Sequence, residues 1–426
     1  VYMDDQLTHL DDDDKESLVN LLFNNELESS LQADISSNII ERLMESLKNE
    51  EYNMSRFAKI CKSTARIMPY CIDLDPLMII DFIKQLLDSE CQDFQIPDKL
   101  KENLLKEFTS EQSENEEPFY YEDSETLKDL MAKIMACSIT RTHICLVGST
   151  GLGKTSMAVA FSEKTSESQE RGPHPYQLFS FNMETQVDDI YGTFSIDKGT
   201  PKISKGPLYL AMENGQTFIA DEFNLAEDTT IQSLAIALES SSGFKILIPG
   251  LSKSIQFDKK FLFIACQNDI KTAGRKLLPP NIAKKLRIFE YPSPTLDDLK
   301  SNCKIIAKSE LLYGDDTVSQ YDAERMAIFI DEINKSKIQF ISKWSMRDVR
   351  KLFRRISDSM INPKKYYNFT IIHHILFYIM SAIPEEISKS VFNEIMKIII
   401  SCFGISPEDT KKFEDCYYEN PRVENI

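Results

Sequence analysis

The stretch "LVGSTGLGKTSMAV", from Leu146 to Val159, decides the fold that the sequence predicts. Three glycines, a lysine and a threonine stand within eight consecutive residues, between two apolar flanks. The 147 residues before Gly148 contain no glycine at all, although the chain of 426 residues has 13 glycines. Because glycine lets the backbone approach a ligand closely, this local concentration indicates a binding loop.

The loop fits the pattern GxxxxGK[ST] over residues 148–155. It follows an apolar strand expected at 144–147 and precedes a helix expected at 156–162, and this context makes the motif credible. Inward-pointing backbone N–H groups and the helix N-terminus would hold phosphate. Lys154 would reach the β- and γ-phosphates of a nucleoside triphosphate, and Thr155 Oγ would bind Mg²⁺. The predicted nucleotide-binding residues are Gly148, Ser149, Thr150, Gly151, Leu152, Gly153, Lys154, Thr155 and Ser156.

A second apolar strand, in "QTFIADEFNLA" (Gln216–Ala226), ends in two carboxylates. Asp221 at this strand end could hold Mg²⁺ through water, as a second metal-site residue beside Thr155. Glu222 is placed to polarise an attacking water. A further apolar strand ends at Asn268, which could orient the same water or could simply be a turn residue that closes the strand.

Five short apolar runs between residues 140 and 292 alternate with helical stretches. They are "THICLVG", "YQLFSFN", "QTFIADE", "KFLFIAC" and "LRIFEYP". Strands interleaved with helices predict an α/β fold in which a parallel sheet is covered by helices on both faces.

The segments on either side of this region have helical periodicity, with apolar residues at i, i+3 and i+4. We expect an all-helical N-terminal segment, in which Ser55 and Asp75 are candidate N-caps and Pro76 suits a first helical turn. The acidic stretch at 109–125 has the composition of a linker. The predicted domains are an acidic helical domain (1–115), a nucleotide-binding α/β domain (116–300) and a helical lid with C-terminal helices (301–426).

The negative charge is concentrated in the first part of the chain. Residues 1–126 carry 30 Asp and Glu against 11 Lys and Arg, whereas the remainder has 37 against 38. This acidity argues against direct nucleic-acid binding by the N-terminal segment, which is either a solvated helical surface or a surface that docks basic proteins.

Neither a membrane nor a secretory location is indicated. The nine cysteines form no CxxC pair and the five histidines are scattered, so no zinc pattern is present. The longest apolar runs are shorter than the ~20 residues that span a bilayer. The first residues are acidic, unlike a secretory signal. We therefore expect an intracellular protein of the cytoplasm or nucleus with no membrane partner.

Several motifs in the expected order resemble the dynein-related, midasin-like subfamily of AAA+ ATPases, over about residues 125–360. "DEFNLAEDTTIQSLAIALES" (221–240) looks like the subfamily's Walker B motif and the helix that follows it. "FKILIPGLSKSIQFDKKFLFIACQND" (244–269) is similar to a hairpin insert followed by the sensor-1 strand. "AGRKLLPP" (273–280) and "WSMRDVRKLF" (344–353) resemble the segment after sensor 1 and the lid motif.

The resemblance implies ATP hydrolysis at a site that a neighbouring subunit completes. It implies that Glu222, Asn268 and Arg347 are catalytic, with Arg347 as sensor 2. The family usually supplies an arginine finger from a stretch that here reads "NIAKKLRIF" (281–289). The finger candidates are Arg287 in this stretch and Arg275 in the preceding "AGRKLLPP". Lys284 and Lys285 in this stretch lack the bidentate fork of arginine.

Three functions remain open at this point. The first is an ATP-hydrolysing module that remodels or organises a protein or ribonucleoprotein partner, as in ribosome assembly, together with adjacent AAA+ modules or as a homo-oligomer. The second is a nucleotide-binding structural module with little hydrolysis. The third is a GTP-dependent, restriction-type subunit of the same clade.

Overall fold

The computed structural model describes most of residues 54–109, 124–166, 174–239, 245–310, 316–361, 371–380 and 388–405, and a few single residues outside them. The chain divides into two units. The first contains the N-terminal helices and the α/β part up to residue 292, and the second consists mainly of residues 293–426. The sequence separates the N-terminal helices from the α/β part, whereas the structure groups them in one unit. The three domain boundaries themselves stay a prediction.

A five-stranded parallel sheet forms the centre of the first unit, with the strand order β2-β5-β8-β1-β9. Every neighbouring pair in it is parallel. The strands are β1 (His143–Val147), β2 (Tyr176–Ser180), β5 (Thr217–Asp221), β8 (Leu262–Gln267) and β9 (Leu286–Glu290). These are the five strands that the sequence predicts, so the α/β fold class is confirmed.

Helices cover both faces of the sheet, and side chains therefore alternate between two buried layers. On one face Cys145, Phe218 and Phe263 belong to a single apolar cluster, in which the two phenylalanine rings stack 5.5 Å apart. Their neighbours Ile144 and Ile264 point to the opposite face and are equally buried. The covering helices are α6 (Glu125–Thr140), α7 (Lys154–Lys164), α9 (Pro207–Asn214), α10 (Asp228–Ser233), α11 (Ala235–Glu239) and α12 (Pro280–Ala283).

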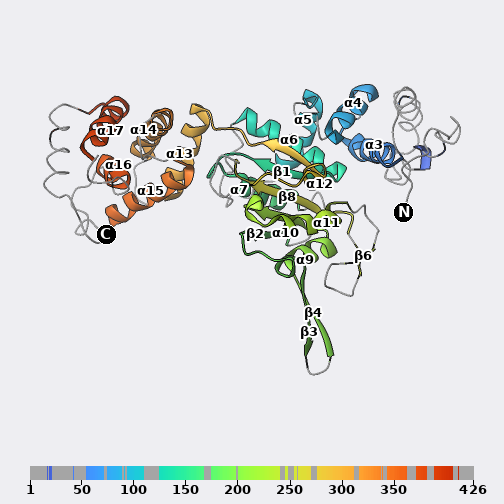
Figure 1. The fold of residues 1–426 in the computed structure, drawn as a ribbon. Coiled ribbons are helices and arrows are strands. Elements are labelled where there is room, and N and C mark those ends of the chain that lie inside the picture. Colours follow the sequence, from blue (N-terminus) through green and yellow to red (C-terminus); the bar gives the residue numbers. More distant parts are fainter. Residues whose placement is uncertain are drawn as a thin grey trace. The chain divides into compact units, whose positions relative to one another are not determined.

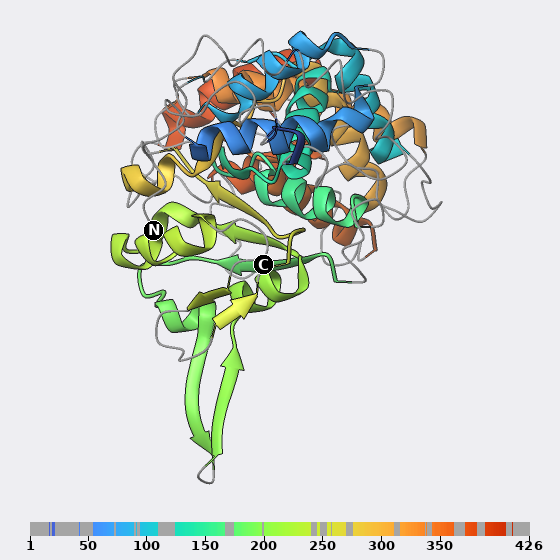
Figure 2. The ribbon, with the colours of Figure 1, turned by 90° about the vertical axis from the view of Figure 1, so that its right-hand side faces the viewer.

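Two antiparallel hairpins interrupt the α/β alternation. β6 (Lys245–Leu247) pairs with β7 (Ser254–Gln256), where the sequence predicts a hairpin insert. The longer hairpin of β3 (Gly192–Asp197) and β4 (Thr200–Lys205) follows the short helix α8 (Val187–Tyr191), and the sequence analysis did not foresee it. It extends away from the sheet on the β2 side, as both views show (Figures 1 and 2).

The base of the β3–β4 hairpin requires glycine. Gly192 has φ +105° and lies against the strand that returns beside it. A Cβ atom placed there would lie 2.0 Å from the carbonyl oxygen of Ser204. Any larger residue at Gly192 would force the two strands apart where they leave the domain.

The N-terminal helices pack on α6, on the β1–β9 side of the sheet (Figure 1). They are α3 (Met54–Ile67), α4 (Pro76–Leu87) and α5 (Asp98–Thr109), with a short 3-10 turn, η2 (Met68–Tyr70), between the first two. The Asp75 cap is confirmed, because its carboxylate accepts a hydrogen bond from Leu77 N at 3.0 Å. The Ser55 cap is wrong, because α3 already begins at Met54. Most of the expected helical segment before Met54 and most of the linker lie outside the described residues.

Arg287 of β9 joins the N-terminal helices to the sheet. Its side chain is 3% exposed and donates hydrogen bonds to the backbone carbonyls of Asp88 and Cys91, in the segment after α4. The guanidinium lies 4.6 Å from the ring centre of Phe94, which itself packs 6.0 Å from Phe289 of β9. Burial lowers the pKa of Arg287 from its ordinary value, but arginine stays charged in proteins. A buried cation thus fixes the segment between α4 and α5 to the sheet edge.

Replacing Arg287 by alanine should lower the free energy of unfolding by about 2–4 kcal/mol, because two carbonyls lose a charged donor and the cation–π contact is lost. Urea unfolding followed by circular dichroism measures this change. Arg56→Ala is the matched control, since Arg56 contacts Asp88 in a half-exposed ion pair at 3.9 Å. Its effect should stay below about 1 kcal/mol. Equal effects of the two substitutions would contradict the anchoring role of Arg287.

The second unit is helical, as the sequence predicts for the region after residue 300. Its helices are α13 (Leu296–Glu310), α14 (Asp316–Lys335), α15 (Met346–Ile361), α16 (Ile371–Met380) and α17 (Ser388–Phe403). One apolar cluster joins them. Trp344 lies within it, with ring centres 5.5 Å from Phe329 and 5.2 Å from Tyr378 in edge-on contacts. In the described part of the chain, no helix combines the length and apolar character that crossing a bilayer requires.

Candidate nucleotide-binding site

The glycine-rich loop leaves the carboxyl end of β1 and enters α7. Gly148 N donates a hydrogen bond to the Gln267 carbonyl of β8 at 3.3 Å, which fixes the start of the loop to the neighbouring strand. Gly151 and Gly153 have φ values of +79° and +96°, in the left-handed region that favours glycine. α7 begins at Lys154, two residues before the predicted start. The loop therefore has the local conformation that its glycines predict.

Lys154 is a buried cation whose three N–H donors are all used. It is 6% exposed, and its Nζ donates to the carbonyl oxygens of Gly148 and Ser149, each at 2.8 Å, and to Asn268 Oδ1 at 2.9 Å. Burial lowers the pKa of Lys154, while the nearby Cys266, Glu222 and Asp221 act in the opposite direction. Its present acceptors are neutral oxygens, so a phosphate would give the ammonium a stronger, charged partner.

Thr155 and Asp221 place two oxygen atoms side by side at the ends of α7 and β5. Thr155 Oγ1 donates a hydrogen bond to Asp221 Oδ1 at 2.8 Å. Hydroxyl and carboxylate oxygens are ligands that Mg²⁺ accepts, together with water and substrate phosphates. The residues present therefore fit a magnesium ion bound beside the phosphate loop.

Glu222 follows Asp221 in a strained backbone conformation. Its φ of 54° and ψ of 34° place it in the left-handed region, which is unfavourable for a residue with a side chain. Its backbone N–H donates to Asp221 Oδ1 at 3.0 Å. Such strain costs about 1–3 kcal/mol and concentrates at functional sites. The conformation directs the carboxylate toward Asn268 rather than along the continuing strand.

Asn268, at the end of β8, connects the lysine to the glutamate. Its Oδ1 accepts from Lys154, and its Nδ2 donates to both carboxylate oxygens of Glu222, at 2.9 and 3.2 Å. Asn224 Nδ2 in turn donates to the backbone carbonyl of Asn268 at 2.9 Å and is fully buried. Asn224, within "DEFNLA", is a positioning residue that no local sequence signal distinguishes, because its partner lies 44 residues further along the chain. The Asn268 side chain is thus hydrogen-bonded to both Lys154 and Glu222, while the catalytic role of Asn268 stays a prediction.

The sensor-2 and finger candidates do not join the contacts around Lys154 in the described residues. Arg347 lies in the first turn of α15 and is exposed, and its role as sensor 2 stays a prediction. Arg275 lies outside the described residues. Arg287 cannot act as a finger for a neighbour, because its guanidinium is buried against the N-terminal helices. Lys284 is exposed, and Lys285 forms an ion pair with Glu239.

Comparison with known proteins identifies the class. Residues 143–285 match the model of the AAA domain of the dynein-related subfamily. This part of the chain, which holds the glycine-rich loop, Asp221, Glu222 and Asn268, is therefore an AAA+ nucleotide-binding module, as the sequence resemblance predicts.

The curated relatives include midasins. Midasin of Dictyostelium discoideum is 30% identical over 149 residues, which is 33% of this chain and 2% of that protein. Midasin of Giardia intestinalis is 23% identical over 180 residues, 42% of this chain and 4% of that protein. The chain thus spans only a few per cent of the length of these relatives. Among solved structures, a RuvB mutant of Thermotoga maritima aligns at 18% identity and a TM-score of 0.39, covering 64% of this chain and 74% of that one.

Replacing Lys154 by alanine should weaken nucleotide binding at least tenfold, because a charge-assisted hydrogen bond contributes about 1.5–3 kcal/mol. Isothermal titration calorimetry with ATP measures the affinity. Lys164→Ala, in the last turn of the same helix, is the control and should change affinity less than twofold. Unchanged affinity in a folded Lys154→Ala variant would contradict the assignment of this loop.

Proposed function

We propose that the chain is a Mg²⁺-dependent ATPase module. The observation that carries the proposal is the continuous contact from Lys154 through Asn268 to Glu222, beside the oxygen pair of Thr155 and Asp221. It brings the residue types that phosphoryl transfer needs to one edge of the sheet: a phosphate-binding cation, metal-binding oxygens and a carboxylate base. The AAA domain match supports the same reading.

Each residue has a distinct proposed role. Lys154 holds the β- and γ-phosphates, and Thr155 and Asp221 are the residues that would hold Mg²⁺, Asp221 through water. The ion would neutralise part of the phosphate charge. Glu222 accepts a proton from the attacking water, and Asn268 orients that water and the glutamate. The side-chain amide of Asn268 is hydrogen-bonded to both Lys154 and Glu222. When Lys154 binds phosphate, the hydrogen bond between Asn268 and Glu222 would therefore change as well.

Glu222→Gln should retain ATP binding and lose turnover by about 10²–10⁴-fold, the usual effect of removing a general base. Phosphate release measures turnover, and calorimetry measures binding in the same preparation. Glu227→Gln is the matched control, because Glu227 is the exposed N-cap residue of α10 and its side chain makes no capping hydrogen bond. Turnover in Glu222→Gln equal to that of the wild type would refute the base assignment.

We further propose that the module acts inside the cell on a protein or ribonucleoprotein partner. The midasin relatives support this, and so do the two hairpins, which extend the α/β domain beyond its core. Adjacent AAA+ modules or further copies of this chain would then complete the site. No membrane partner is proposed.

One observation favours a second candidate, a structural module that binds ATP and hydrolyses it slowly. The only arginine in the stretch at 281–289 is Arg287, which is buried, so a neighbouring copy would be offered lysines at this position. An arginine finger contributes about 10³–10⁵-fold to phosphoryl transfer, and a lysine lacks its fork.

Turnover per chain, measured against protein concentration, separates the two candidates. A shared site predicts turnover that rises with concentration and falls at least tenfold in Arg275→Ala or Lys284→Ala. Lys128→Ala, on the exposed side of α6, is the control. Slow turnover that is independent of concentration and unaffected by both changes favours the structural module. Fast turnover that is likewise independent of concentration and unaffected by both substitutions would refute a shared site.

A further inference from the structure

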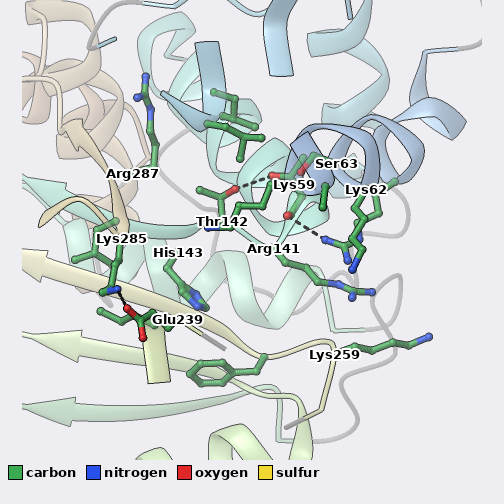
Figure 3. A pocket seen from close by; sticks show the side chains of 18 of the residues that line it. Lys59, Lys62, Ser63, Arg141, Thr142, His143, Glu239, Lys259, Lys285 and Arg287 are labelled. Carbon is green, nitrogen blue, oxygen red and sulfur yellow. Dashed lines mark hydrogen bonds and ion pairs between the residues drawn. The ribbon is translucent and has the colours of Figure 1, made fainter. Parts of the chain in front are cut away.

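A second pocket lies away from the nucleotide site, between α3 and the β1–β9 side of the sheet (Figure 3). Its volume is about 640 Å³, and eight of its twenty lining residues are lysine or arginine. Two are carboxylates, of which Glu239 forms an ion pair with Lys285. We call it the basic pocket and define it by Lys59, Lys62, Arg66, Arg141, Lys259 and Lys284.

α3 supplies three of these cations from one face. Lys59, Lys62 and Arg66 are spaced i, i+3 and i+7, which places them in one row along the helix. Arg66 also donates to the Thr140 carbonyl at the end of α6 at 3.3 Å, which fixes the row against the core. Within the described part of the chain, Lys59 and Lys62 have no carboxylate partner. Like charges gathered in this way repel one another unless an anion lies between them.

Arg141 adds a cation at a position where the backbone favours glycine. Thr142 N donates to the Cys137 carbonyl at 2.8 Å, and Arg141 N donates to the Ser138 carbonyl at 3.1 Å. This is the Schellman pattern at a helix C-terminus, in which the left-handed residue is usually glycine. Arg141 occupies that position with φ 57°. Among the described residues other than glycine, Glu222 alone shares a positive φ, and it belongs to the nucleotide site.

We propose that the basic pocket binds a small polyanion with several phosphate groups. The ammonium groups of Lys59 and Lys62 and the guanidinium of Arg141 would neutralise its charge. The half-buried hydroxyl group of Thr142, which also lines the pocket, would bind a further phosphate oxygen. The volume lies within the range of about 300–1,000 Å³ that is typical of small-molecule sites.

The lining favours phosphates over other anionic partners. Single-stranded nucleic acids need aromatic rings on which bases stack, whereas the pocket's aromatic residues, His143 and Phe261, are 7% and 5% exposed. Acidic peptides need apolar contacts beside their carboxylates, whereas Leu238 and Leu286 are 6% and 2% exposed and Leu87 is half-buried. The accessible polar groups are mainly cations, which match compact phosphate clusters.

The test is a calorimetric titration of the full chain with myo-inositol hexakisphosphate. ADP is present in excess, so that the phosphate loop is occupied. The wild type should bind the probe, more weakly at higher salt because charge pairs are screened. Lys59→Ala/Lys62→Ala should weaken binding at least tenfold. Lys128→Ala/Lys205→Ala removes two lysines that pair with surface glutamates elsewhere on the first unit, and it should change affinity less than twofold.

Arg141→Gly separates a ligand role from a structural role. Glycine adopts the left-handed conformation without strain, so the urea unfolding midpoint should stay the same or rise. Binding of hexakisphosphate should nevertheless weaken severalfold, because a pocket cation is lost. A residue that served only the fold would give the opposite pattern, with a lower midpoint and unchanged binding.

Three results would overturn the proposal. One is the absence of hexakisphosphate binding to the wild type. Another is binding that the Lys59→Ala/Lys62→Ala variant retains in full, because the probe would then lie elsewhere. The third is a decaglutamate peptide that binds as tightly as hexakisphosphate and competes with it, because the pocket would then recognise charge without phosphate chemistry.

Discussion

The buried ammonium of Lys154 is the constraint on which the arrangement of the site depends. A charge that is removed from water must be fully hydrogen-bonded, or the fold loses several kcal/mol. Three oxygen atoms meet this need, from Gly148, Ser149 and Asn268. Two belong to the glycine-rich loop, which must therefore curl back over the lysine. The third comes from the end of β8, which must lie next to β1, as the sheet order places it.

The same constraint extends to Glu222. The amide of Asn268 has one acceptor and two donors, and the acceptor is used by Lys154. Its donors are then directed at the Glu222 carboxylate, which the left-handed backbone at this residue turns toward β8. Lys154, the proposed phosphate-binding residue, and the proposed base are thus linked through one side chain. Such a link provides a physical route by which occupancy of the phosphate loop could alter the position of the glutamate.

Arg287 plays a comparable part at the β9 edge of the sheet. It follows the lysine pair of the predicted finger stretch, yet its guanidinium is used internally, against the Asp88 and Cys91 carbonyls and the Phe94 ring. By holding the segment after α4 on β9, it keeps the N-terminal helices against the α/β core. The basic pocket lies in this junction, so an acidic segment contributes part of a cationic surface. Net charge summed over 126 residues does not reveal such a local arrangement, because it averages over all faces of the helices.

Much of the fold could be predicted from local patterns. Short-range periodicity predicts the five strands and the helices on either side of them, and glycine content predicts the GxxxxGK[ST] loop. Both signals are contained in consecutive residues. The nomination of Asp221, Glu222 and Asn268 also followed from strand ends, because parallel strands finish at one edge of a sheet. The β3–β4 hairpin was missed, although its base requires Gly192, because its register depends on pairing between separated segments.

What the sequence by itself determined is the class of the α/β domain and the residue types at its candidate nucleotide site. The tertiary structure decided which side chains face one another: Asn268 between Lys154 and Glu222, Arg287 buried instead of offered to a neighbour, and the lysines of α3 gathered beside Arg141. The physical reason is that burial and charge pairing depend on distances in space, and residues such as Asp88 and Arg287 meet only after the chain has folded.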